Sequence, residues 1–241
     1  VGLTTMLVAS ISEAASGGFA IPVDEDFRRI VGQLRQGKSP EYGFLGVVPG
    51  PLSMAARPLG GGGVLIQSII PNTPADQANL LLDDIVLEID GHTVREPADL
   101  SRIVGKKAPG ATIEVKLDRR GREVIKKIVL AKRYLDSRRR AVSSTPTPRW
   151  RGMIIDQPTA VPSLIGRAYA IDKDGCVGVV DVDPESGAWR AGMRPGDFIT
   201  VVGGVRVKSV AEFTQQVARL DGPVDVVVTD GDRRGPRRRI P

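Results

Sequence analysis

The stretch Gly63-Val-Leu-Ile-Gln-Ser-Ile-Ile-Pro-Asn-Thr-Pro-Ala-Asp-Gln-Ala-Asn-Leu-Leu-Leu-Asp-Asp-Ile-Val-Leu-Glu-Ile-Asp-Gly91 is repeated further along the same chain. A shift of 113 positions superposes it without a gap on a second copy that ends at Gly204. The shift pairs turn residues and apolar residues alike: Pro71 with Pro184, Ala75 with Ala188, Asp84 with Asp197, Val64 with Val177 and Leu100 with Phe213. This internal repeat predicts a duplicated domain.

Local chemistry predicts the elements of one copy. Residues 64–70 are a β-branched apolar run that stops at a Pro-Asn pair, which is typical of a buried strand entering a turn. Thr73 is expected to cap a short helix that begins at Pro74. Asn79 occupies the position of a glycine in the second copy, so we expect a left-handed residue at the end of this helix. A second strand is expected at 84–89, before an Asp-Gly turn.

A longer helix and a last strand complete each copy. We expect the helix at 97–104 in the first copy and at 210–220 in the second, where Ser209 and Glu212 form a Ser-x-x-Glu capping box. The last strand is indicated by alternating apolar residues, at 113–117 and again at 226–228.

This order of elements resembles a bacterial-type PDZ domain. The second copy reads Ser186-Gly-Ala-Trp-Arg-Ala-Gly-Met-Arg-Pro-Gly-Asp-Phe-Ile199, which is close to the small-Ala-x-x-Ala-Gly-Leu-x-x-Gly-Asp-x-Ile pattern of that family. In the first copy Asn79 and Asp83 replace the two glycines of the pattern. The fold class implied is mainly β with short helices (α+β), built as tandem PDZ-like β-sandwich domains.

Composition agrees with two small folded domains. The chain has 241 residues, of which 41% are hydrophobic and only 4% aromatic, so aliphatic side chains must fill the cores. The single cysteine, Cys176, excludes an intrachain disulfide and a multi-thiolate metal site, and we expect it to be buried in strand packing. No metal site and no cofactor are expected.

The net charge of +6 raises the alternative of a basic protein that binds nucleic acid or a membrane surface. The two arginine runs, 138–140 and 237–239, have no interleaved aromatic residues, so we interpret them as solvated charge and do not expect nucleic acid as a partner. The first run lies in a polar, proline-bearing segment that reads as a linker. The second is expected to be the edge strand of the second copy, protected by Pro236.

The N-terminal segment resembles a larger family. Gly18-Phe-Ala-Ile-Pro22, a helix at 24–36 capped by Asp24 and stopped by Gly37, and then Tyr42-Gly-Phe-Leu-Gly-Val47 form a series that resembles the passage from a trypsin-like barrel into the first PDZ domain of HtrA-type serine proteases. Residues 1–11 are expected to be a strand of that barrel. The resemblance implies these domains: residues 1–40, the end of the protease domain; 41–133, PDZ domain 1; 134–148, a linker; 149–241, PDZ domain 2.

The chain itself is not expected to cleave peptides. A trypsin-like triad needs histidine, aspartate and serine, and the only histidine, His92, is placed in a surface turn. Ser16 precedes two glycines but lacks the rest of a nucleophile motif. On the family pattern the triad lies upstream of Val1.

PDZ domains bind an extended peptide as an added strand and hold its terminal carboxylate on backbone N–H groups. The resemblance places the carboxylate loop of the first copy around Gly46, with candidate donors in Leu45, Gly46 and Val47. The predicted peptide-binding residues of the first copy are Phe44, Leu45, Gly46, Val47, Leu100, Ile103 and Val104. Those of the second copy are Trp150, Arg151, Gly152, Met153, Phe213, Gln216 and Val217.

Two points about these residues stay open on sequence alone. The helix residues 100, 103 and 104 line either the groove or the core, and Arg151 either adds charge to carboxylate recognition or lies on the surface. The connection from Gly152 to Gly175 is also longer by six residues than that from Gly46 to Gly63, which indicates an insertion in the second copy.

The function implied by the resemblance is peptide binding by the tandem PDZ region of an HtrA-like serine endopeptidase that serves protein quality control. Its expected partners are C-terminal tails or unfolded polypeptides, an upstream protease domain, and further copies of the chain in a trimer formed through that domain. The family implies the bacterial cell envelope or periplasm. The alternative is a non-catalytic PDZ adaptor or a degenerate protease.

Overall fold

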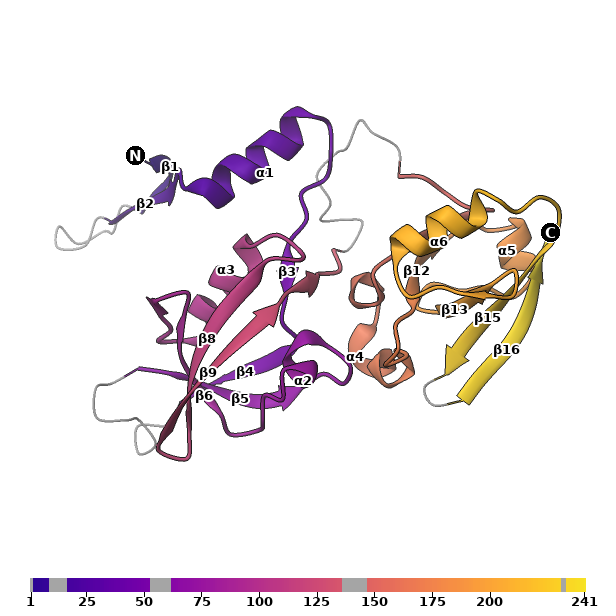
Figure 1. Cartoon of the computed structure of the whole chain (residues 1–241). Helices are drawn as coiled ribbons and strands as arrows, with labels where there is room; N and C mark the ends of the chain where they lie inside the picture. Colours follow the sequence, from indigo (N-terminus) through magenta and orange to yellow (C-terminus); the bar gives the residue numbers. More distant parts are fainter. Residues whose placement is uncertain (1, 9–16, 53–61, 136–146, 231–232) are drawn as a thin grey trace.

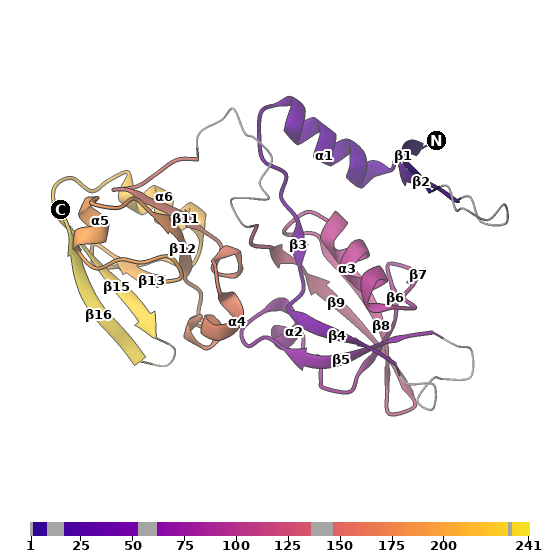
Figure 2. The same ribbon diagram turned by 180° about the vertical axis from the view of Figure 1, so that it is seen from behind.

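The structure is a computed structural model that describes residues 2–8, 17–52, 62–135, 147–230 and 233–241. Two sheet-containing lobes lie side by side, and the short helix α4 (Leu164–Arg167) lies between them (Figures 1 and 2). We call them the first lobe (residues 41–133) and the second lobe (residues 149–241). None of the helices among the described residues is long and apolar enough to cross a membrane.

The N-terminal segment forms two paired strands and a helix, of which the sequence predicted the first strand, over 1–11, and the helix, but not the pairing. Strand β1 (Gly2–Val8) pairs antiparallel with β2 (Gly17–Pro22), and α1 (Glu25–Arg35) follows. The carboxylate of Asp24 caps this helix by accepting from the N–H of Phe27 at 2.8 Å. None of the residues of α1 is buried, and Leu34 of its apolar stripe is 43% exposed.

The first lobe contains a six-stranded antiparallel sheet and two helices. Its strands follow the order β4-β5-β6-β8-β9, with β7 attached to β6, while β3 pairs with β10 outside this sheet. The elements are β3 (Gly43–Phe44), β4 (Val47–Pro51), β5 (Val64–Ile69), α2 (Pro74–Gln77), β6 (Ile85–Ile89), β7 (His92–Thr93), α3 (Pro97–Lys106), β8 (Thr112–Arg119), β9 (Arg122–Val129) and β10 (Ala131–Lys132). His92 is exposed, as predicted, but it begins the two-residue strand β7 directly after the Asp-Gly turn and does not lie in the turn itself.

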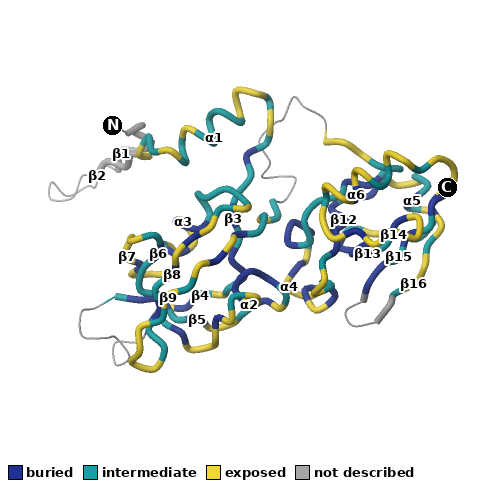
Figure 3. The backbone as a smooth tube through the Cα atoms, viewed as in Figure 1, coloured by how far each residue is buried: buried dark blue, intermediate teal, exposed yellow. Residues whose placement is uncertain are grey.

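The second lobe repeats this topology. Its strands follow the order β11-β12-β13-β15-β16, with β14 attached to β13, which confirms the duplication predicted from the shifted sequence. The elements are β11 (Met153–Asp156), β12 (Val177–Val182), α5 (Gly187–Arg190), β13 (Phe198–Val202), β14 (Val205–Arg206), α6 (Val210–Val217), β15 (Val224–Asp230) and β16 (Arg233–Ile240). In both lobes the buried residues lie along the sheets and the helix faces that cover them (Figure 3).

Helix-terminal residues adopt the predicted conformations, with one difference. Asn79 has φ +53°, and Ser209 caps α6 by accepting from the N–H of Glu212 at 3.2 Å. Thr73 is the N-cap of α2, but its hydroxyl donates to the carbonyl of Ile70 at 2.6 Å instead of accepting from the helix. This bond holds the Thr73 side chain inside the lobe, where it is completely buried.

The duplicated aspartates are buried ion-pair centres. Asp84, 1% exposed, accepts two hydrogen bonds of 2.7 Å from the guanidinium of Arg119. Asp197 at the equivalent position is 4% exposed and accepts from Arg238 at 2.8 Å. Arg238 comes from the C-terminal arginine run, which forms the edge strand β16, as predicted.

The insertion in the second lobe packs against the first lobe. It contains the 3-10 turn η3 (Pro158–Ala160), α4, and the 3-10 turn η4 (Ala168–Ala170). Its apolar residues share one buried cluster with Ile70 of the first lobe, and Phe44 packs against that cluster. The side-chain amide of Asn72 also donates to the carbonyl of Ala168 at 3.3 Å.

Two sequence interpretations lie outside the described residues. Ser16 is one, and the arginine run 138–140 with most of the expected linker is the other. The domain boundaries at 40, 133 and 148 stay predictions.

Candidate binding grooves

The loop around Gly46 directs its carbonyl groups into the first lobe. The N–H of Ala75 donates to the carbonyl of Leu45 at 2.9 Å, and the N–H of Ile70 donates to the carbonyl of Gly46 at 2.8 Å. Neither the N–H of Leu45 nor that of Gly46 donates a hydrogen bond to any residue that the structure describes. Consecutive backbone N–H groups left open in this way form a site suited to an anion.

Gly46 is required by both its conformation and its surroundings. Its φ is +93°, a region that side chains rarely adopt. A Cβ at this position would lie 2.0 Å from Oγ1 of Thr73. Because Thr73 is buried and hydrogen-bonded, the loop and the start of α2 can approach this closely only at a glycine.

The strand that follows this loop has an open edge. Strand β4 is the terminal strand of its sheet, paired on one side with β5. The N–H of Ile70 donates to the carbonyl of Gly46, which makes Val47 and Ile69 a non-hydrogen-bonded pair of this antiparallel ladder. The N–H of Val47 therefore points to the outer edge. The open amides and the open edge are therefore continuous.

The three residues predicted on the facing helix are buried in the core. Leu100, Ile103 and Val104 are 4%, 8% and 5% exposed and belong to the cluster that fills the first lobe. Leu45 of the loop joins the same cluster. Their packing agrees with the core alternative left open on sequence, and a role in lining the groove stays a prediction.

Helix α1 braces the end of α3. Arg29 donates to the carbonyl of Lys106 at 2.6 Å and to that of Glu41 at 3.0 Å, and the Lys106 ammonium pairs with Asp24 at 3.0 Å. The N–H of Phe27 and, to a lesser degree, Lys106 lower the pKa of Asp24. These bonds fix the end of α3 that lies beside β3.

The side chain of Phe44 packs against the second lobe, and a role for Phe44 in peptide binding stays a prediction. Phe44 lies in β3, paired with Ala131, and its side chain packs against the apolar cluster that the insertion of the second lobe shares with Ile70. The residue before the open amides is thus held by the other lobe. No local pattern in the sequence signals this contact, because it joins segments more than one hundred residues apart.

The corresponding loop of the second lobe is a tight turn. Arg151 and Gly152 have φ values of +52° and +88°, as in a type I′ turn. The N–H of Trp150 donates to the carbonyl of Met153 at 2.8 Å, and the N–H of Met153 donates to the carbonyl of Trp150 at 2.9 Å. The outward N–H of Met153, the counterpart of Val47, is therefore already taken.

Arg151 is half-buried and bonded to backbone carbonyls, and a role for it in carboxylate recognition stays a prediction. Its guanidinium donates to the carbonyl of Ile240 at 2.9 Å and to that of Gly222, and it lies 5.1 Å from the centre of the Trp150 ring. Arg151 thus fastens the turn to the end of β16. Because these carbonyls are more than seventy residues away in the sequence, no local pattern could predict the bonds of Arg151 to them.

Trp150 covers the helix at this end of the second groove. Its ring meets that of Phe213 edge-on, with the centroids 5.4 Å apart. Phe213 is 3% exposed, whereas Gln216 and Val217 on the same helix are half-buried. Phe213 is thus packed against the protein's own indole, and a role for Phe213, Gln216 and Val217 in peptide binding stays a prediction.

Lys132 joins the two lobes electrostatically. Its ammonium lies 2.6 Å from a carboxylate oxygen of Glu41 in the first lobe and 2.5 Å from one of Asp156 in the second. Burial lowers the pKa of Lys132, but the hydrogen bonds to Asp156 and Glu41 outweigh burial and raise this pKa above its usual value. The backbone N–H of Lys132 also donates to the Gln157 side chain at 2.9 Å.

Family comparison places both lobes. Residues 42–129 match one PDZ domain model, and residues 178–229 match a second. The chain contains two PDZ domains. The first match lies within the first lobe and the second match within the second lobe, in agreement with the resemblance and the fold class expected from the sequence, and the two lobes are called the first and the second PDZ domain below.

Curated relatives of these PDZ domains are described as proteases. A probable periplasmic serine endoprotease, DegP-like, of Halomonas elongata is 33% identical over 208 residues, which are 84% of this chain and 42% of that protein. The protein of the same description in Brucella suis is 28% identical over 227 residues, which are 92% of this chain and 42% of that protein. The chain thus spans less than half of the length of these relatives. They confirm the expected resemblance to HtrA-type proteases.

A solved structure also resembles the chain. An HtrA-type protease, AlgW, with a tripeptide is 23% identical, with a TM-score of 0.42 over 56% of this chain and 46% of that one.

Proposed function

We propose that the first PDZ domain captures the C-terminal tails of unfolded polypeptides by adding them as a strand to β4. The observation that carries the proposal is the pair of open amides at Leu45 and Gly46, next to the outward N–H of Val47. A terminal carboxylate fits these donors, and an extended peptide fits the edge that begins there. The carbonyls of the loop are turned inward, so they do not repel the anion.

We propose further that the chain is the peptide-binding part of an HtrA-like serine endopeptidase of the bacterial periplasm. The names of its relatives support this activity and this compartment. The catalytic triad and a trimer contact would both be supplied by a protease domain preceding Val1. A Gly-(Asn/Asp)-Ser-Gly-Gly motif about 10 to 15 residues upstream of Val1, with histidine and aspartate before it, is the expected finding. A region without the serine or the histidine would favour a non-catalytic adaptor or a degenerate protease.

Binding of one peptide in two chemical forms tests the carboxylate site. The probe is a fluorescent ten-residue peptide with an apolar C-terminal residue, prepared with a free carboxylate and as the C-terminal amide. We expect micromolar binding of the free form, about −8 kcal/mol. Loss of one to two charge-assisted hydrogen bonds, about 1.5–3 kcal/mol each, should weaken the amide at least about tenfold. Equal affinity of both forms would remove the carboxylate assignment.

The arginines of β16 give no support to a nucleic-acid function. Arg237 pairs with Asp225 at 2.8 Å and Arg238 with the buried Asp197, so two of the three charges in this run serve the sheet. Peptide binding at the open amides should change little with ionic strength, whereas binding to phosphates would fall steeply with salt.

A further inference from the structure

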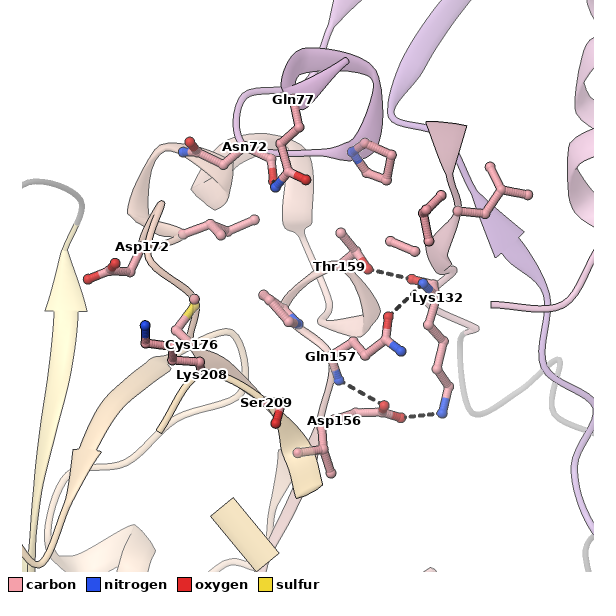
Figure 4. A pocket seen from close by; sticks show the side chains of 18 of the residues that line it. Asn72, Gln77, Lys132, Asp156, Gln157, Thr159, Asp172, Cys176, Lys208 and Ser209 are labelled. Atoms are coloured by element: carbon pink, nitrogen blue, oxygen red, sulfur yellow. Dashed lines mark hydrogen bonds and ion pairs between the residues drawn. The ribbon is translucent and has the colours of Figure 1, made fainter. Parts of the chain in front are cut away.

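A cavity of about 560 Å³ lies between the two PDZ domains (Figure 4). Such a volume is within the range of about 300–1,000 Å³ that ligand sites in proteins usually have. Asn72 and Gln77 border it from the first domain, and Asp156, Cys176 and Ser209 border it from the second. Apolar residues of both domains complete its wall: Pro74, Val129, Leu130, Pro158, Ile171 and Val210.

One side of this cavity is fixed by bonds between the domains. Lys132 pairs with Asp156, and its carbonyl accepts from the hydroxyl of Thr159 at 2.7 Å (Figure 4). Gln157 accepts from the backbone N–H of Lys132. Both partners of each bond line the cavity, so its shape depends on the two domains keeping this arrangement.

The cavity lies at one end of β11 and α6, the strand and helix between which a PDZ domain binds its peptide. It is bordered by the last residue of β11, Asp156, and by the first turn of α6 with its N-cap Ser209. At the opposite end of β11 is the turn in which the carbonyl of Trp150 accepts a hydrogen bond from the N–H of Met153. Met153 and Asp156 are three residues apart, about 10 Å of extended strand. The N–H group that would hold a carboxylate is therefore taken, whereas the cavity lies further along the same strand.

The unneutralised charge around the cavity is positive. The wall carboxylates of Glu41 and Asp156 are paired with Lys132, and that of Asp172 is paired with Arg206 at 2.6 Å. Lys173 and Lys208 are exposed on the cavity wall, and neither ammonium has an ion-pair partner among the described residues. An acidic side chain of a ligand would complement both lysines.

We propose that this cavity binds an internal, extended segment of polypeptide that carries acidic side chains and needs no free C-terminus. The inference rests on the proposed function in that the ligand is a polypeptide. On this proposal the two PDZ domains recognise different parts of a polypeptide. The first domain binds C-terminal ends, and the second domain, together with the cavity wall of the first, binds an internal segment.

A peptide without free ends tests this proposal on the full chain. The probe is a labelled twelve-residue peptide of alternating glutamate and apolar residues, acetylated and amidated, and the matched control replaces every glutamate by lysine. We expect the acidic probe to bind and the basic probe not to bind. Charge reversal at both exposed lysines, Lys173→Glu with Lys208→Glu, should weaken the acidic probe about tenfold. Lys38→Glu, an exposed lysine outside the cavity, should change binding less than twofold.

Each outcome decides between the two sites. Equal binding of acidic and basic probes, or unchanged binding to the double variant, would overturn the cavity proposal. A free-carboxylate tail peptide is measured on the same double variant. If that peptide still binds while the blocked probe binds no variant, the cavity proposal fails and the carboxylate site of the first domain stands. If neither peptide binds the wild-type chain, the proposed function fails as well.

Discussion

Replacement of Gly46 by alanine tests the loop geometry on which the carboxylate site depends. The new Cβ would lie 2.0 Å from Oγ1 and 2.3 Å from Cβ of Thr73. Thr73 is completely buried and bonded to Ile70, so it cannot turn away. Gly91→Ala is the matched control, because Gly91 also has positive φ, +75°, but a Cβ there would meet nothing within 4 Å.

The expected destabilisation follows from two separable costs. The left-handed backbone costs a non-glycine residue about 1–2 kcal/mol, and this applies to both variants. The forced contact with Thr73 adds about 1–3 kcal/mol, as overpacking of a filled site does, and this applies only to Gly46→Ala. We therefore expect a loss of about 2–5 kcal/mol for Gly46→Ala and of about 1–2 kcal/mol for Gly91→Ala.

Hydrogen exchange of the β8 and β6 amides under increasing urea measures the stability of the first PDZ domain by itself. This separation matters because unfolding of two domains need not be two-state. Both tryptophans, Trp150 and Trp189, lie in the second domain, so tryptophan fluorescence gives an internal control that should be unchanged. Equal destabilisation by the two substitutions would show that the loop and α2 do not approach closely in solution, which would refute the reasoning for the cradle.

Three further predictions concern buried charges and the thiol. Arg119→Met should destabilise the first domain by about 3–5 kcal/mol, because it leaves the carboxylate of Asp84 buried without its partner. Arg102→Met removes an exposed ion pair and should cost less than about 1 kcal/mol. Urea titration measures the free energy of unfolding of both variants, and equal losses would contradict the buried pair. Burial raises the pKa of Cys176 to about 11, so at pH 8 about one thiol in a thousand is ionised and alkylation by iodoacetamide should be about a hundredfold slower than in urea-unfolded chain; equal rates would contradict its burial. Hydrogen bonds to Asp156 and Glu41 raise the pKa of Lys132 above its ordinary value in the folded state, so the charged ammonium stabilises the fold fully below that ordinary value and this contribution is lost as the pH rises through the raised pKa. The stability difference between wild type and Lys132→Met should therefore shrink as the pH rises above the ordinary pKa of lysine, and a difference that grows there would refute the pairing.

The fold was largely predictable because its signals are local. The left-handed residue at Asn79, the cap at Ser209 and the Asp-Gly turn at residue 90 each depend on the chemistry of a few neighbouring residues. The strand β9 (Arg122–Val129) gives no alternating signal, because its apolar residues come as two adjacent pairs, Val124-Ile125 and Ile128-Val129, separated by two lysines on a half-exposed edge. Its pairing with β8 comes from a tight turn at Arg120 and Gly121, both with positive φ.

The candidate site was predictable only where backbone geometry defines it. A glycine at position 46 with neighbours of the PDZ pattern indicated the open amides of Leu45 and Gly46. The apolar stripe of α3 indicated a covered face, but a stripe does not say which element covers it, and Leu100, Ile103 and Val104 all face the core. In the second domain, hydrogen bonds from Arg151 to the carbonyls of Ile240 and Gly222 hold the loop in its tight turn. Such contacts between distant residues produce no periodic pattern in the sequence, so they could not be predicted from it.

The insertion of the second domain makes the two copies unequal in a way that their common ancestry does not suggest. Its apolar residues, with Leu164 only 8% exposed, share a cluster with Ile70 of the neighbouring copy. A gene fragment that encodes only the second copy would therefore expose this apolar surface to solvent and produce a protein that tends to aggregate. Reversing the order of the copies would have the same consequence, so recombination that shuffles these modules is constrained to keep them as a pair.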